Sequence, residues 1–413
     1  MQNVYTKNLY NVKHSASQQV AIRIGLIILL IFAVLRPITL MVGSIGISGT
    51  NMLEIFGIGI SYFFLIPLTA GFRQIKFDRT FFISIIFCLY CVDSILWGSK
   101  IREIAITILP FLLYFSVRAF ITELKELKIL IISIYFSFII PIALSTYNII
   151  ADRNITVVEF WNQLPRNAGA FSGPHTLAYT MLLVSFFFCI LNYLYQFKNV
   201  ITRLIIYFFL ILSFYCLYQS HTRTAIIGFI IFWLIYLLRN NRLLFYCAIV
   251  LSIIIGILFQ SNIQSLIWKT PAEHDIDRAT SGRTIMFKNN VRFFIDSSLL
   301  KKIIGNGISD ESRYGYHNDF MRLLISYGLI GLSLYFALLF YILWDIFLFE
   351  DYKTKYLFAA VLISVAAMNF GSNGYVFRIE LSQYFWIMVG LFYNIREIKI
   401  GKYDTIKNKI GNS

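Results

Sequence analysis

Apolar runs of about 20 residues follow one another along nearly the whole chain, and they limit what it can fold into. A helix needs about 20 such residues to cross the hydrocarbon core of a bilayer. Only 14% of the 413 residues are charged, whereas soluble domains carry about 25%. Because a bilayer offers no water to the backbone, spanning segments without a closed barrel must be helical. We count about twelve runs, at 22–42, 53–71, 80–98, 102–121, 128–150, 174–196, 201–219, 223–239, 243–262, 317–349, 355–371 and 380–396. The sequence therefore predicts an all-α polytopic integral membrane protein, with residues 1–413 forming a single membrane domain.

The basic residues between these runs predict the orientation of the chain. More than half of the 36 Lys and Arg lie in segments that share one side of the membrane if the N-terminus starts there. Short cytoplasmic loops carry such an excess. We therefore expect both termini in the cytoplasm and two longer segments, 151–173 and 263–316, outside. The net charge of +15 is then mainly a topology signal, and we expect no nucleic-acid partner.

The first outer segment brings Arg166 and His175 to the start of a predicted helix near Pro174. Glycine and proline make the approach irregular. Free backbone N–H groups and the helix dipole favour an anion at such a position, and the two side chains add to that preference. The plainer interpretation is a solvated loop whose arginine meets lipid headgroups.

A second polar group is the tight turn Gln219–Ala225 between two predicted spans. It contains His221 and Arg223 but no acid. An arginine at full membrane depth costs roughly 2.5–3.5 kcal/mol, and less near the interface. We interpret Arg223 as kept there for an external anionic partner, with snorkelling to a headgroup as the alternative.

The long segment 263–316 should contain short helices. An amphipathic stretch begins at Gly282-Arg283, and some of its apolar residues are suited to the membrane interface. These are Ile285, Phe287, Val291, Phe294 and Ile295. A glycine turn, Gly305-Asn306-Gly307, comes later.

His317 stands at the start of the next apolar run, beside Asn318 and Arg322. A lone histidine is often structural, but this one is expected to face the outer leaflet among polar groups. The acids and histidine of 273–277 are a local alternative, because they could hold a divalent cation. A solvated charge cluster is the commoner meaning, so we expect neither a metal nor a cofactor.

A series of short motifs between residues 160 and 345 resembles the O-antigen polymerase (Wzy) and O-antigen ligase (WaaL) superfamily. Each is weak, but they occur in order. The motifs are Arg166 to Phe171, Ser220 to Ala225, Gly282-Arg283, Gly305-Asn306-Gly307, His317-Asn318 and Gly328-Leu329-Ile330-Gly331. The chain departs from the pattern at His221, which separates Ser220 from the Thr222-Arg223 pair.

The resemblance implies a metal-independent, inverting glycosyltransferase of the GT-C type in the bacterial inner membrane, with a periplasmic active site. It would move a glycan from undecaprenyl diphosphate to a sugar hydroxyl. Arginine forks suit the diphosphate, and histidine suits the proton transfer. In this scheme His317 is the base and Arg166, Arg223 and Arg283 clamp the diphosphate. The further binding residues are His175, His221, Arg313, Arg322 and Asn318.

Three functions stay open at this point. A polymerase would use a single lipid-linked repeat unit as acceptor, with a chain-length regulator as a candidate protein partner. A ligase would transfer the finished chain to lipid A–core. A flippase or transporter would carry charges at mid-membrane and show internal repeats, whereas here the polar groups gather toward the outer face. Lipid-linked oligosaccharides and membrane lipids are the expected partners.

Overall fold

The computed structural model describes residues 16–42, 77–156, 166–240 (without 196 and 198), 243, 246, 283–307 and 318–410 (without 373). Within these residues, seven helices are long and apolar enough to cross a membrane. They confirm an all-α, multi-span membrane protein. The predicted spans 53–71 and, apart from two residues, 243–262 lie outside the described part of the chain, so the total of twelve stays a prediction.

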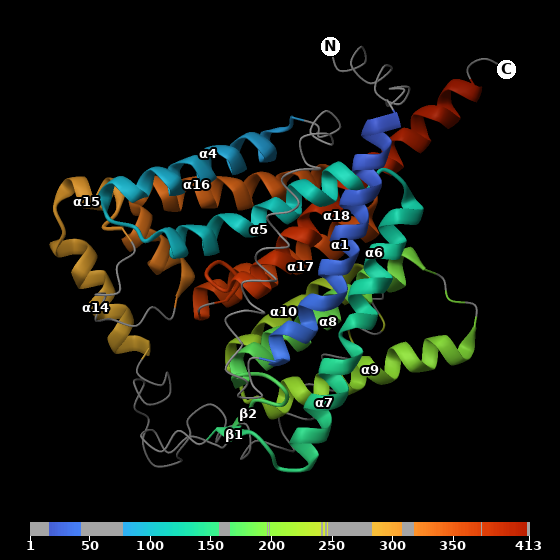
Figure 1. The fold of residues 1–413 in the computed structure, drawn as a ribbon, viewed down its shortest axis with the longest axis horizontal. Coiled ribbons are helices and arrows are strands. Elements are labelled where there is room, and N and C mark those ends of the chain that lie inside the picture. The colour runs from blue at the N-terminus through green and yellow to red at the C-terminus, as the bar shows by residue number, and fades with distance from the viewer. Residues whose placement is uncertain are drawn as a thin grey trace.

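The elements follow one another from α1 to α18 (Figure 1). The helices are α1 (Ala16–Val42), α4 (Arg79–Asp93), the 3₁₀ helix η2 (Ser94–Trp97), α5 (Ile101–Phe120), α6 (Leu124–Ser137), α7 (Ile139–Ile150), α8 (Pro174–Leu194), α9 (Val200–Gln219), α10 (Arg223–Asn240), α14 (Arg283–Asp296), α15 (Leu299–Ile304), α16 (Asp319–Leu348), α17 (Tyr352–Gly371) and α18 (Ile379–Ile410). Two short strands, β1 (Ile155–Thr156) and β2 (Arg166–Asn167), pair antiparallel.

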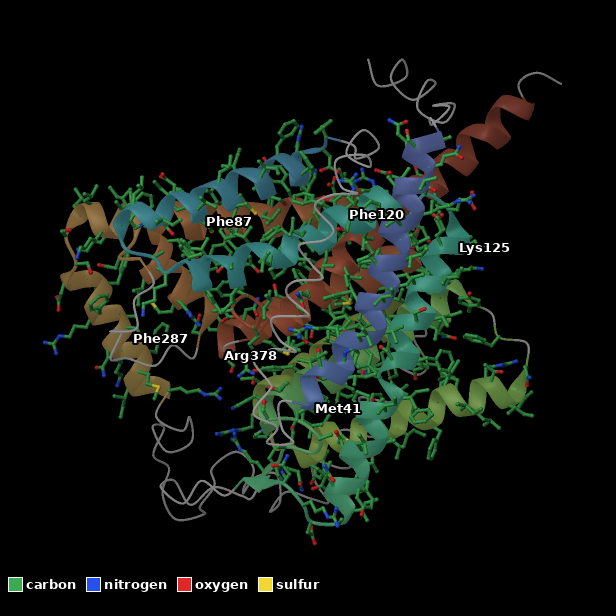
Figure 2. All side chains as sticks on the ribbon, viewed as in Figure 1. Met41, Phe87, Phe120, Lys125, Phe287 and Arg378 are labelled. Carbon is green, nitrogen blue, oxygen red and sulfur yellow. The ribbon has the colours of Figure 1, made fainter. Side chains whose placement is uncertain are left out.

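Helices α8 and α18 form the centre of the bundle. Nearly every side chain of α8 is buried, and α18 packs along α5, where the Trp386 ring lies 4.0 Å from that of Phe111. By contrast, many side chains of α1, α4 and α9 are apolar and exposed, as expected of helices that face lipid (Figure 2).

The two ends of the bundle differ in what they carry. The first turn of α1 and the last turns of α18 lie at one end, whereas α14, α15 and the β1–β2 pair lie at the other (Figure 1). We call the latter the loop end. The start of α1 and the end of α18 lie at the same end, which agrees with an even number of spans between them. Assignment of the loop end to the periplasm remains a prediction.

A buried arginine joins the helices at the opposite end. Arg118 of α5 donates to Asp78 at 2.6 Å and to Glu397 of α18 at 2.9 Å, and only 1% of its side chain is exposed. Its guanidinium also lies 4.9 Å from the centre of the Tyr393 ring. Such a buried ion pair holds its partners in one geometry, because removing one partner leaves a buried charge uncompensated.

At the loop end, the two glycine motifs interlock. Helix α16 is interrupted at Gly328, whose φ is +66°, so the carbonyls before the break lack their helical partners. The turn after α15 supplies replacements: the Asn306 N–H donates to Ile325 O at 2.8 Å and the Gly307 N–H to Ser326 O at 3.1 Å. A Cβ on Gly305 would lie 2.2 Å from Ser326 O. The motifs therefore anchor α14 and α15 against α16.

Candidate functional site

Arg166 is presented by a tightly hydrogen-bonded segment. Its strand pairs with β1, and the chain then turns through Gly169, whose φ is +59°. The Asn154 side chain donates to the carbonyls of Gly169 and Phe171, both at 3.0 Å. These contacts hold the β1–β2 pair and the following turn in one conformation, and so fix the position of Arg166 at the loop end.

Arg223 is the first residue of α10, and the turn before it is anchored to α8. The Thr222 hydroxyl donates to Pro174 O at 3.3 Å. The hydroxyls of Thr224 and Tyr179 lie 3.0 Å apart. The turn therefore places Arg223 beside the start of α8, which also carries His175.

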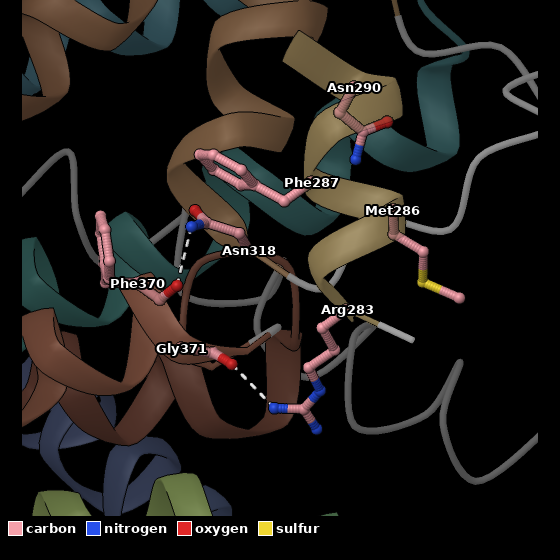
Figure 3. A pocket seen from close by; sticks show the side chains of 7 residues that line it. All are labelled: Arg283, Met286, Phe287, Asn290, Asn318, Phe370 and Gly371. Atoms are coloured by element: carbon pink, nitrogen blue, oxygen red, sulfur yellow. Dashed lines mark hydrogen bonds between the residues drawn. The ribbon is translucent and has the colours of Figure 1, made fainter. Parts of the chain in front are cut away.

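Arg283 is the first residue of α14, and it binds the C-terminal end of α17. Its Nη1 donates to Gly371 O at 2.8 Å, while Asn318 Nδ2 donates to Phe370 O at 2.7 Å (Figure 3). These carbonyls lack partners within their own helix, and a cation is favourable at this end of the dipole. The Asn318 Oδ1 accepts from Met321 N at 3.0 Å and so caps α16. In this structure Asn318 is therefore engaged by two backbone groups.

The three arginines lie close enough to act on one another electrostatically. Burial lowers the pKa of Arg166, and the charge of Arg283 lowers it further. Burial also lowers the pKa of Arg283. The charges of Arg283 and Arg166 both act on Arg223. We call these three residues the arginine cluster.

No carboxylate among the described residues forms an ion pair with Arg166 or Arg283. Gathering like charges in a partly buried place costs free energy unless an anion compensates. Three guanidinium groups placed in this way could bind an anion that carries more than one negative charge, and such an anion would offset this cost.

His221 lies beside the cluster in a left-handed backbone conformation, with φ of +47°. Burial lowers the pKa of the imidazole, and the charge of Arg166 lowers it further. Its Nδ1 is buried and has no hydrogen-bond partner within the described residues. A neutral His221 adds no charge to the cluster, but its ring can still donate or accept a hydrogen bond.

The loop between α17 and α18 was not predicted as part of the site. Asp319 is fully buried, and its Oδ2 accepts from Gly374 N at 2.8 Å and from Val376 N at 3.1 Å. This contact brings Arg378 next to α8, where it donates to Thr176 Oγ1 at 3.2 Å. The sequence signal that could have identified Arg378 is its position directly before the last apolar run. Arg322 lies over the Phe377 ring, 4.2 Å from its centre.

The structure thus gathers four of the predicted site residues. They are Arg166, Arg223, Arg283 and His221. His175 lies at the adjacent start of α8, Asn318 contacts the backbone at the end of α17, and Arg322 lies over the Phe377 ring just before α18. His317, Arg313 and the acidic stretch 273–277 lie outside the described residues, so their roles stay predictions.

The fold and the site define a multi-span membrane protein that carries a cationic cluster at its loop end. Residues 208–336 match a family model described as O-antigen ligase. The matched segment contains the turn before α10, the start of α14 and the glycine motifs. It confirms the predicted resemblance to the O-antigen polymerase and O-antigen ligase superfamily. No curated protein matches the sequence.

Proposed function

We propose that this protein is a glycosyltransferase that moves a glycan from undecaprenyl diphosphate to the hydroxyl of an acceptor sugar. The observation that carries the proposal is the arginine cluster. Arg166, Arg223 and Arg283 come from distant parts of the chain, and each is partly buried. The match of residues 208–336 supports the same class of reaction.

The proposed chemistry requires neutralisation of a leaving diphosphate. The acceptor hydroxyl attacks the anomeric carbon from the face opposite the diphosphate, so the configuration inverts. A new carbon–oxygen bond forms, the bond to the diphosphate oxygen breaks, and the electron pair stays on that oxygen. Guanidinium forks aimed at this developing charge stabilise the transition state more than the ground state.

The proton of the attacking hydroxyl also needs an acceptor. We propose His317 for this role, because the ordinary pKa of a histidine lies near neutrality. His317 precedes Asn318, whose amide contacts the end of α17, and this end also receives Arg283. The base and the clamp would therefore be supported by the same helix end.

Two acceptors are compatible with this chemistry. We propose a lipid-linked repeat unit, which makes the protein a polymerase with a chain-length regulator as candidate partner. The description of the matched family favours the second candidate, a ligase that uses lipid A–core. The donor, the leaving group and the arginine cluster are the same in both.

Deletion of the gene in its own host separates the two. Without a polymerase, lipid A–core should carry a single repeat unit and no ladder of longer chains. Without a ligase, long chains should accumulate on the undecaprenyl carrier while lipid A–core carries none. An unchanged glycan profile in both fractions would contradict the proposed function.

A further inference from the structure

A pocket opens at the loop end between α14, the start of α16 and the end of α17 (Figure 3). Its lining combines two aromatic rings, two amides and one member of the arginine cluster. The lining residues are Arg283, Met286, Phe287, Asn290, Asn318, Phe370 and Gly371.

The aromatic side chains of this pocket are accessible. Phe287 is 43% exposed and Phe370 is 66% exposed, although both stand beside hydrogen-bonding amides. Binding sites for small molecules pair apolar or aromatic walls with a few placed polar groups. A sugar ring has the matching surface, since it carries C–H groups on its faces and hydroxyls at its rim.

Asn290 supplies a buried polar group to this pocket. The residue is 3% exposed, and its amide forms no side-chain hydrogen bond within the described part of the chain. Figure 3 shows this amide on the wall that α14 contributes. An amide offers two donors and one acceptor oxygen, which suits adjacent hydroxyls or an acetamido group.

Arg283 joins the pocket to the arginine cluster. One of its nitrogens is held by Gly371 O, and its charge acts on both Arg166 and Arg223. A sugar bound between Phe287 and Phe370 would therefore have a diphosphate-binding group at its edge. We propose that this pocket binds a sugar residue of the lipid-linked glycan, an inference that rests on the proposed function.

The test compares binding of two probes to purified full-length protein. One is undecaprenyl diphosphate without sugar, and the other is the lipid-linked oligosaccharide extracted from cells that lack this protein. Loss of one aromatic contact should weaken binding of the second probe about tenfold. We expect this in Phe287→Ala and Phe370→Ala, with binding of the sugar-free probe unchanged.

Matched controls lie on the same helix. Phe293 of α14 is 41% exposed but does not line the pocket, so Phe293→Ala should bind both probes like the wild type. Asn290→Ala should weaken binding of the oligosaccharide only, whereas Asn289→Ala should change the affinity for neither probe. Retained affinity for the sugar-free probe shows that each variant is folded.

Equal affinities of the wild type, Phe287→Ala and Phe370→Ala for the oligosaccharide would overturn the sugar pocket. So would a loss of affinity for both probes in Phe370→Ala when the protein remains folded by thermal unfolding. Failure of the wild type to bind sugar-free undecaprenyl diphosphate would instead overturn the proposed function, and this inference with it.

Discussion

Arg166 and Arg283 at the loop end carry charges that no carboxylate among the described residues pairs with. Arg166 shows this most clearly, because burial and, to a smaller extent, the charge of Arg283 disfavour its protonated form. Sites that bind strongly charged ligands often hold side chains in an energetically unfavourable arrangement until the ligand binds. Substitutions in the arginine cluster should therefore lower activity without lowering the stability of the substrate-free protein.

Arg166→Gln provides the first test. Removal of one of three repelling charges should leave the melting temperature of the substrate-free protein unchanged or raise it. Loss of one donor to the leaving group should lower the transfer rate about 10²–10³-fold. Thermal unfolding and transfer assays on the same preparation measure both. A lower melting temperature with normal transfer would exclude Arg166 from the cluster's proposed role.

Substitutions of Arg223 test whether the site needs the planar geometry of a guanidinium group or only a positive charge. In cells, Arg223→Ala should abolish long glycan chains while the protein reaches the membrane in normal amount. Arg223→Lys should recover only part of the chains, since a point charge cannot grip two oxygens as a guanidinium does. The ladder of chain lengths is the measurement, and a normal ladder in the Ala variant would remove Arg223 from the site.

His221 should make stability depend on pH. Its pKa in the folded protein lies below the usual value of about 6.5, because of burial and the charge of Arg166. Just below that usual value the unfolded chain binds more protons than the folded protein, so stability falls as pH falls through this range. Between pH 7.5 and 5.5 the melting temperature of the wild type should fall more than that of His221→Asn. Asparagine also tolerates the left-handed conformation found here. Identical pH dependence in the two proteins would contradict this account.

At the scale of elements, the apolar runs predicted most of the described helices, because length and hydropathy decide which segments can span. The interlock between the Gly305 turn and Gly328 was not predicted. A glycine pair in a sequence indicates a turn but does not say which carbonyls the turn will bind. The gathering of Arg166, Arg223 and Arg283 was expected from the family resemblance, which assigns all three to one diphosphate clamp on the outer side. Arg378 was missed because the Asp319 contact that places it joins residues 55 or more positions apart.

The interlock predicts a sharp contrast between glycines. In Gly305→Ala the new methyl group would clash with Ser326 O, and φ of +98° is strained for alanine. We expect a loss of stability of about 3 kcal/mol or more. Nothing lies within 4 Å of a Cβ added at Gly173, so the Gly173→Ala variant should be as stable as the wild type. It should therefore be extracted from membranes in the same amount. Size-exclusion chromatography of fluorescently tagged protein compares the two, and equal monodisperse peaks would contradict the interlock.

For the whole molecule, the proposed function requires that the loop end faces the periplasm. The basic residues predict the periplasm. A reporter active only in the periplasm should be active when fused after Gln264 or Ser281, and silent after Arg239 or at the C-terminus. The reverse pattern would place the arginine cluster in the cytoplasm, away from the proposed substrate.

The central claim is that the arginine cluster binds the diphosphate of a lipid-linked glycan and promotes its transfer without a metal. The most direct measurement is glycan transfer by purified protein in chelator, with lipid-linked oligosaccharide from cells that lack the protein. We expect wild-type turnover to release undecaprenyl diphosphate, and Arg166→Gln and Arg223→Ala to release at most about one part in 10² of that amount in the same time. Normal turnover by both variants, or loss of wild-type turnover in chelator, would contradict the account.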